Sequence, residues 1–370
     1  MNINNMNLNM NIYKICITLI ALSLMISCNN YEKKSNLPHN TGEVVSEVMN
    51  AKVEDDKLSY KYYDVFDMKP VEVIIPKNQT IAQGLSILVT DNNENIIVFD
   101  GGRVEDSDHL CEIIKNKGGI VSTWYITHIH DDHLGALYDI LSKKRTDITI
   151  KEVAYQFTDF DWYYSKMGAD AGIVKLFENA IIEYNAYLAS IGREQIKVED
   201  NILSSDKRAR AYLHRDDKGK LISDINVFAI NDNVYKLDQD PINNTSVVYY
   251  VDIEKNINDT KLKESIGMVV FGDLGFEGGN KLFNYIDEFE AGFKRIYDAD
   301  ILVLSHHGQN GIDPELYKRF KPKVVIWPTS KDVYENVNGK YYTDDVKDAL
   351  SRIKSIKYEF KSYEDTVVLR

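Results

Sequence analysis

Residues 127–133 carry the sequence Thr-His-Ile-His-Asp-Asp-His, which places three imidazoles and two carboxylates within six residues. The motif directly follows the apolar residues 123–126, which are predicted as a strand, and precedes residues 134–144, which are predicted as a helix. Side chains alternate along a strand, so the first two histidines point to the same side, and the chain then turns toward a second point nearby. Imidazole and carboxylate together suit zinc, and also manganese or iron. The alternative is a polar surface turn. The candidate metal ligands of the motif are His128, His130, Asp132 and His133.

Further polar residues follow other predicted strands along the chain. Asp100 ends the strand at residues 96–99 and is followed by two glycines. Asp273 follows the strand at residues 268–271, and the pair His306-His307 follows the strand at residues 301–304. Adjacent side chains diverge, so we expect only one histidine of the pair to bind metal. Which of the two does so is left open by the sequence.

In this order, the set of motifs resembles the metallo-β-lactamase superfamily between residues 71 and 330. The resemblance implies an α/β fold, a four-layer αβ/βα sandwich. It implies that Asp273 bridges two metal ions and that one residue of the His306/His307 pair is the late ligand. It also implies that Asp100 supports the metal-binding histidines from behind, since such carboxylates fix the tautomer of a ligand. The predicted cofactor is zinc (Zn²⁺), as two ions, with Mn²⁺ or iron as alternatives.

Three shorter stretches resemble the hydrolase domain of the ComEC-type competence channel. They are residues 83–88 (Gln-Gly-Leu-Ser-Ile-Leu), 244–248 (Asn-Thr-Ser-Val-Val) and 306–308 (His-His-Gly). Many superfamily members place a third histidine between the first motif and the bridging Asp; the only candidate here is His214, and the alternative is that His214 is a surface histidine. The ComEC-type pattern has Asn244 near that place instead, as a residue behind the metal ligands, so that the first ion would be held by His128, His130, Asp273 and solvent. Because the chain has no polytopic membrane region, we do not expect a channel. The resemblance favours cleavage of a phosphoester or phosphodiester.

The predicted activity is therefore hydrolysis by a hydroxide shared between two metal ions, with Asp132, His306 and His307 as the catalytic residues. The histidine of the pair that does not bind metal is the candidate proton donor or phosphate contact. An amide or ester hydrolase, such as a β-lactamase or lactonase, is one alternative. A lipid-anchored binding protein with a degenerate metal site is the other.

The rest of the chain alternates strands and helices, which predicts two mixed sheets sandwiched between helices. We expect this domain to span residues 57–370, with residues 158–240 as an insertion over the mouth of the site. Within that insertion, residues 173–188 have apolar positions at helical spacing. An aromatic cluster precedes it and either packs in the core or binds a base or a choline-like cation; its members are Tyr155, Phe157, Phe160, Trp162, Tyr163 and Tyr164.

The N-terminus predicts export. The largely apolar run of twelve residues at positions 15–26 is too short to span a bilayer but suits the core of a signal peptide. They lead to Ser27-Cys28, which resembles the lipobox of bacterial lipoproteins, so we expect a lipidated Cys28 and a flexible tether at residues 29–56. An ordinary cleaved signal is the alternative. The predicted location is the cell membrane or envelope, held by the lipid anchor only.

Charge and cysteine content restrict the partners further. The formal net charge of −13 disfavours general binding to nucleic acid, so the predicted partner is a small-molecule or phosphoester substrate. Only three cysteines exist, and if Cys28 is lipidated and Cys16 leaves with the signal, Cys111 has no disulfide partner. The helical pattern around Cys111 predicts a buried structural thiol.

Overall fold

The computed structural model describes residues 58–66, 68–91, 95–204, 206–215, 221–230, 236–255, 265–289 and 291–370. The predicted signal peptide, Cys28 and the predicted tether lie outside the described residues. Among the described residues, none of the helices combines the length and the apolar character needed to cross a membrane.

Cys111 is a buried free thiol on a helix, as predicted, and burial raises its pKa to about 12.

Two sheets form the centre of the molecule. The first has the strand order β1-β16-β2-β3-β4-β5-β7-β8, with β6 also paired to β5. Its strands are β1 (Tyr60–Tyr63), β2 (Val71–Ile75), β3 (Ser86–Asp91), β4 (Ile96–Asp100), β5 (Ile120–Tyr125), β6 (Thr149–Ile150), β7 (Glu152–Ala154), β8 (Lys197–Glu199) and β16 (Thr366–Leu369). The second sheet has the order β15-β14-β13-β12-β11-β10-β9. Its strands are β9 (Ala209–Arg215), β10 (Leu221–Ala229), β11 (Tyr249–Lys255), β12 (Ser265–Val270), β13 (Ile301–Val303), β14 (Val324–Trp327) and β15 (Tyr358–Lys361).

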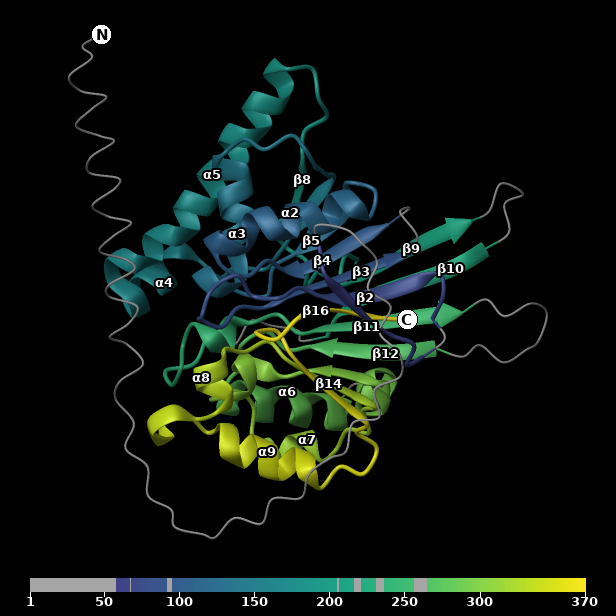
Figure 1. Cartoon of the computed structure of the whole chain (residues 1–370). Coiled ribbons are helices and arrows are strands. Elements are labelled where there is room, and N and C mark those ends of the chain that lie inside the picture. Colours follow the sequence, from purple (N-terminus) through teal and green to yellow (C-terminus); the bar gives the residue numbers. More distant parts are fainter. Residues whose placement is uncertain are drawn as a thin grey trace.

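Helices cover the outer face of each sheet (Figure 1). The α-helices are α2 (Ser107–Asn116), α3 (Asp131–Ser142), α4 (Phe160–Met167), α5 (Gly172–Ser190), α6 (Phe276–Phe289), α7 (Pro314–Tyr317), α8 (Lys331–Tyr334) and α9 (Thr343–Ser351). The short 3₁₀ helices are η1 (Val104–Asp106), η2 (Gly168–Ala171), η3 (Asn243–Thr245), η4 (Ala291–Asp298), η5 (Ser305–Gly308) and η6 (Val337–Gly339).

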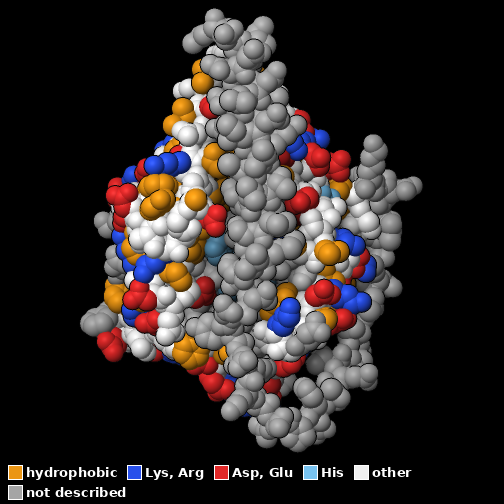
Figure 2. Space-filling model, turned by 90° about the vertical axis from the view of Figure 1, so that its left-hand side faces the viewer, with side chains coloured by type: hydrophobic (Ala, Val, Ile, Leu, Met, Phe, Trp, Pro, Cys, Tyr) orange, Lys and Arg blue, Asp and Glu red, His pale blue; other side chains and the backbone are white. Residues whose placement is uncertain are grey.

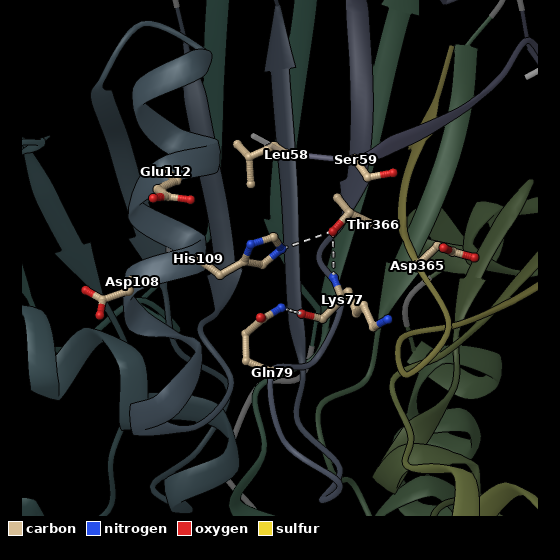
Figure 3. Close-up of a pocket in the computed structure, with 9 residues that line it drawn as sticks. All are labelled: Leu58, Ser59, Lys77, Gln79, Asp108, His109, Glu112, Asp365 and Thr366. Carbon is tan, nitrogen blue, oxygen red and sulfur yellow. Dashed lines mark hydrogen bonds between the residues drawn. The ribbon is translucent and has the colours of Figure 1, made fainter. Parts of the chain in front are cut away.

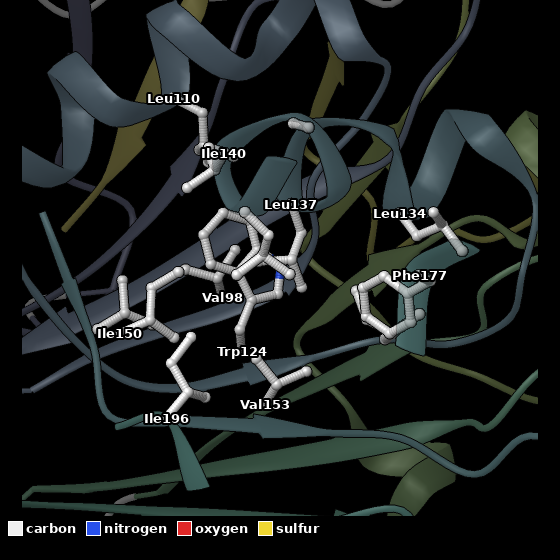
Figure 4. Close-up of a cluster of buried hydrophobic side chains, with 14 of the residues drawn as sticks. Val98, Leu110, Trp124, Leu134, Leu137, Ile140, Ile150, Val153, Phe177 and Ile196 are labelled. Atoms are coloured by element: carbon white, nitrogen blue, oxygen red, sulfur yellow. The ribbon is translucent and has the colours of Figure 1, made fainter. Parts of the chain in front are cut away.

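Three layers of buried apolar side chains hold these elements together. One layer packs α2, α3 and α5 against the first sheet and includes Trp124 and Phe177 (Figure 4). A second fills the space between the two sheets, and a third packs α6 and α9 against the second sheet. Because β4 is covered on both faces, all five of its residues are buried, as expected for a central strand. The predicted four-layer αβ/βα sandwich is confirmed.

Some predicted boundaries are wrong. The helix expected at residues 134–144 begins at Asp131, inside the metal motif, because His130 is extended and its acidic successors favour the first turn of a helix. The apolar pattern of residues 148–157 predicts one strand, but the structure has the two short strands β6 and β7 there. The pattern of residues 281–296 predicts one helix, but the structure has α6 and η4 in its place. The predicted helix at residues 173–188 is α5, which packs on the first sheet.

Candidate metal centre

The candidate residues meet at one end of the sandwich. The parallel neighbours β4 and β5 in the first sheet end there, as do β12, β13 and β14 in the second. Two hydrogen bonds join the sheets at this end: Val247 N–H donates to Thr127 O over 2.9 Å, and the Tyr249 hydroxyl donates to Ile126 O over 3.0 Å. The loops that follow these strands therefore converge on one point.

Six side chains at this point form two groups, each able to hold one metal ion. The first group is His128, His130 and Asp273; the second is Asp132, His133 and His307. Within each group, the potential ligand atoms all lie within 4.8 Å of one another. Asp273 also reaches the second group, since its Oδ1 lies 3.0 Å from His133 Nε2 and its Oδ2 lies 3.5 Å from His307 Nε2. This is the position expected of a bridging carboxylate.

The polar atoms at the centre have no hydrogen-bond partner. His133 Nε2, His307 Nε2 and Asp273 Oδ1 are all buried and unpaired, although burying such groups without a partner costs several kcal/mol. Both imidazole nitrogens lie close to the Asp273 carboxylate: His133 Nε2 is 3.0 Å from Oδ1, and His307 Nε2 is 3.5 Å from Oδ2. Ligand atoms around a shared cation have this arrangement. The donor set, imidazole nitrogens with carboxylate oxygens, therefore fits zinc or a similar divalent ion.

The structure separates the two histidines of the adjacent pair. His307 is buried in the second group, and its Nδ1–H donates to Pro328 O over 2.6 Å. That hydrogen bond leaves Nε2 free to bind metal, and Nε2 lies 3.1 Å from Asp132 Oδ2. His306 belongs to neither group, and its side chain is partly exposed at the mouth, with Nε2 3.8 Å from Asp273 Oδ2.

Asp100 lies behind the second group and supports it. Its carboxylate is fully buried and accepts three hydrogen bonds of 2.7 Å, from the Thr127 N–H, the Thr127 hydroxyl and His133 Nδ1. Because Nδ1 of His133 carries the hydrogen, Nε2 faces the metal position as a free acceptor. Asp100 thus lies where the sequence resemblance places a supporting carboxylate.

Carboxylates and imidazoles at the centre shift one another's pKa values, and the central carboxylate stays ionised. Burial alone would raise the pKa of Asp273, yet His133, His307 and His306 hold it well below its ordinary value. Burial would lower the pKa of His307, but Asp273 and Asp132 raise it to about 9. Burial and the neighbouring His133 instead lower the pKa of His128 well below its ordinary value. Ionised carboxylates at the centre of a buried site are what a bound cation requires.

Neither Asn244 nor His214 belongs to the two groups of candidate metal ligands. Asn244 Oδ1 accepts hydrogen bonds from Gly275 N–H (3.0 Å) and Gly278 N–H (3.1 Å), so it fixes the loop that carries Asp273 rather than binding metal itself. His214 lies on β9 and is paired in register with Ser223, whose hydroxyl donates to Asp91. Asp91 is at the opposite end of β3 from the metal centre. His214 is therefore a surface-strand histidine and no metal ligand.

One glycine is required by the close approach of two loops. Gly272 precedes Asp273 and has a φ of +59°, in the left-handed region. A Cβ at this position would lie 2.7 Å from Thr127 Cβ and Oγ1. Glycine alone lets the Asp273 loop of the second sheet reach the histidine loop of the first.

Sequence reasoning missed three residues beside the centre. Arg103 lies 2.7 Å from Asp131 Oδ2 and 3.4 Å from Asp132 Oδ2. Asp240 Oδ2 lies 3.9 Å from His306 Nδ1, and the Asn243 amide donates to Asp240 Oδ1 over 2.8 Å. Burial raises the pKa of Asp240, while His306 and His130 oppose this shift. None of the three belongs to a recognisable motif, so only their positions in the fold identify them.

The aromatic cluster at residues 155–164 is mostly packed. Tyr155 and Tyr163 are buried in the apolar layer beneath α5, and Tyr163 OH lies 3.3 Å from Thr245 Oγ1. Lys175 Nζ lies 3.6 Å from the centre of the Phe160 ring. Tyr164 is the member that is largely exposed, at 58%. These positions favour the packing alternative for most of the cluster.

Figure 2 shows the face at this end of the sandwich, where histidine reaches the surface among acidic side chains.

A separate pocket of about 460 Å³ lies between α2 and the loop before β16 (Figure 3). Its lining residues are Leu58, Ser59, Lys77, Gln79, Asp108, His109, Glu112, Asp365 and Thr366. None of the six candidate metal ligands lines it, so the pocket is distinct from the metal centre.

The structure is thus a four-layer αβ/βα sandwich with two groups of candidate metal ligands where the strands end, as the sequence resemblance to the metallo-β-lactamase superfamily implies. Among solved structures, the metallo-β-lactamase fold protein YhfI from Bacillus subtilis matches with a TM-score of 0.39 and 9% identity, over 78% of this chain and 94% of that one. A diphosphatase from the PhnP family and unliganded yeast PDE1 each match with a TM-score of 0.40 and 10% identity, over 81% of this chain and 97% of theirs. No family model matches the sequence, and no curated protein matches it. At these TM-scores, the likeness carries no information on substrate.

Proposed function

We propose that the protein is an exported metal-dependent hydrolase that cleaves phosphoesters, with phosphodiesters as the main class. The observation that carries this proposal is the meeting of unpaired, buried ligand atoms from both sheets around Asp273. Such an arrangement is costly for folding and is useful for holding two cations side by side. The ComEC-type pattern of the sequence supports phosphoester cleavage over other hydrolytic reactions.

His128, His130 and Asp273 would hold one ion, and Asp132, His133 and His307 would hold the other. When bound in these positions, zinc or manganese would lower the pKa of a water molecule and neutralise charge on a phosphoryl group. The protein itself fixes the ligands. Asp100 orients His133, and Asn244 holds the loop that carries Asp273.

His306 is the candidate substrate contact. Its side chain lies at the mouth of the centre, 15% exposed, and its Nε2 is 3.8 Å from Asp273 Oδ2. A phosphate bound at the metal ions would place an oxygen beside this imidazole. We propose that His306 donates a hydrogen bond to that oxygen or to the leaving group, while His307 stays with the metal.

The cellular setting is part of the same proposal. A signal peptide that ends before a lipidated Cys28, followed by a tether at residues 29–56, would hold the enzyme at the cell membrane or envelope. The net charge of −13 supports a small or singly exposed phosphoester rather than general nucleic-acid binding.

The test combines metal content with hydrolysis. We would purify residues 29–370, supply Zn²⁺ or Mn²⁺, measure bound metal by mass spectrometry, and assay bis-p-nitrophenyl phosphate, p-nitrophenylphosphorylcholine and nitrocefin. We expect two ions per chain and turnover of a phosphodiester, both lost in Asp132→Ala. Turnover of nitrocefin alone would make the protein an amide hydrolase. Undiminished activity in Asp132→Ala would overturn the catalytic assignment, and absence of both metal and turnover would leave a binding protein.

A further inference from the structure

Backbone strain singles out one residue beside the metal centre. Among the described residues, six other than glycine have a positive φ, and four of these lie at the centre: Asp100, Asp240, His306 and His307. Left-handed backbone is unfavourable for residues with a Cβ and persists where the surrounding structure requires it, often at functional sites. Asp100 and His307 have roles in supporting or binding metal. Asp240, with a φ of +46°, has no such role.

The contacts of Asp240 place its charge at the mouth. Its Oδ2 lies 3.9 Å from the buried, unpartnered Nδ1 of His306, and its side chain is 40% exposed to solvent. The Asn243 amide donates to Asp240 Oδ1 over 2.8 Å and also lies 3.4 Å from His306 Nε2. Asp240 therefore adds a fixed negative charge on the solvent side of His306, where a substrate enters.

Among the described residues, the ion pair of Asp240 is with His306, and it has none with a lysine or arginine. Five basic side chains on segments that follow strands of the two sheets lie within 4.0 Å of another carboxylate, while Lys340 has no such pair; the pairs are Arg103–Asp131, Lys166–Asp238, Lys236–Asp159, Lys281–Glu277 and Lys331–Glu335. A site built for a phosphomonoester dianion commonly presents an unpaired arginine or lysine to the extra charge. In this protein, the second negative charge of a phosphomonoester would instead be repelled by the Asp240 carboxylate.

We propose that Asp240 is a specificity-determining residue that makes the metal centre prefer singly charged phosphodiesters over doubly charged phosphomonoesters. This inference rests on the proposed function, because it assumes that a phosphoryl group binds at the metal ions. A diester carries one negative charge and a monoester carries nearly two above pH 7. Repulsion by one further charge at about 8 Å amounts to roughly twofold to thirtyfold in affinity, depending on the local dielectric constant.

The test compares two anions in the metal-loaded protein. We would titrate the purified protein, supplied with Zn²⁺, with inorganic phosphate and with dimethyl phosphate at pH 8 by calorimetry, and measure kcat/KM for p-nitrophenyl phosphate and bis-p-nitrophenyl phosphate. The variant is Asp240→Asn, since asparagine tolerates left-handed backbone and keeps the oxygen that accepts from Asn243. The control is Asp298→Asn, which removes an exposed charge before β13, at the opposite end from the centre.

We expect Asp240→Asn to shift both ratios about fivefold toward the doubly charged anion, while metal content and Tm stay as in the unmodified protein. Asp298→Asn should leave both ratios unchanged. Equal ratios in Asp240→Asn and in the unmodified protein, or failure of either anion to bind, would overturn the inference. A fall in Tm or metal content with unchanged ratios would show that Asp240 is merely structural. If both anions bind as expected but neither ester is cleaved, the proposed function fails while the charge preference of the site stands.

Discussion

Replacing Asp100 by asparagine tests whether the buried carboxylate sets up the second metal position. The side chains have nearly the same shape, so Asp100→Asn can keep the hydrogen bond from Thr127 N–H. The second oxygen becomes an NH₂ group that faces Thr127 Oγ1 and His133 Nδ1, each now 2.7 Å from that oxygen. An NH₂ group cannot accept from His133 Nδ1–H, so the imidazole would move its hydrogen to Nε2. That atom then no longer offers a lone pair to the metal.

The size of the effect follows from these contacts. Loss of a residue that orients a metal ligand typically weakens metal binding by about 10–100-fold, or about 1.4–2.7 kcal/mol. A hydrogen bond to a charged group contributes about 1.5–3 kcal/mol, so the apo fold should lose a similar amount. We therefore expect one zinc ion to bind as in the unmodified protein and the other to bind about 10–100-fold more weakly.

The assay is competition for zinc with a chromophoric chelator, together with metal counts by mass spectrometry and unfolding in urea. Asp139→Asn is the matched control. Asp139 is also buried, lies on α3, and accepts from the Ser107 hydroxyl over 2.6 Å, but it contacts no metal ligand. Equal zinc affinities for both ions in Asp100→Asn would refute the role given to Asp100. Equal losses in both variants would show that the effect comes from general damage to the fold.

Three further changes test other parts of the structure. His307→Ala should remove one bound ion and lower kcat by at least about 100-fold, so a variant that keeps both ions would contradict its assignment as a ligand. Gly308→Ala places a Cβ 2.3 Å from Trp327 Cε3 at a φ of +74°, which should lower the free energy of unfolding by about 2–4 kcal/mol in urea; an unchanged midpoint would count against it. Burial would raise the pKa of Glu152, but Lys197 and Arg210 hold this pKa below its ordinary value of 4.5. Ionised Glu152 therefore contributes fully to the stability of the fold above pH 4.5, and this contribution is lost as the pH falls through the lowered pKa. Glu152→Gln should therefore reduce stability at pH 7 and flatten its acid dependence, and curves that stay parallel down to about pH 3 would argue against this.

The sequence was sufficient to predict the layers and to identify most of the candidate metal ligands. Strand patterns followed by polar residues predicted that Asp100, His128, Asp273 and the His306/His307 pair lie at strand ends. The structure brings them together, because the strands that carry them run parallel and end at the same side. Motif order is therefore a good guide where each residue is fixed by the strand before it.

The sequence could not choose between His306 and His307, and the reason is local backbone geometry. Both residues have a positive φ, at +47° and +59°, so the alternation that holds in a strand does not apply to them. The hydrogen bond from His307 to Pro328 O separates their roles, and Pro328 follows a strand that is a neighbour only in the folded sheet. Asp240 was missed for a related reason, since its contact with His306 joins residues 66 positions apart that share no motif.

The origin of the ligands explains why this fold suits a metal centre. The first sheet supplies His128, His130, Asp132 and His133, while the second supplies Asp273 and His307. Neither sheet alone can complete a group, since each group contains at least one ligand from the other sheet. The geometry of the centre is thus determined by the packing of one sheet on the other, and the apolar layer between them fixes that packing over the whole length of the strands. Because this inner layer is closely packed, the buried ligand atoms cannot rearrange to find other hydrogen-bond partners. Flexible loops could rearrange and so avoid the free-energy cost of burying unpaired polar atoms.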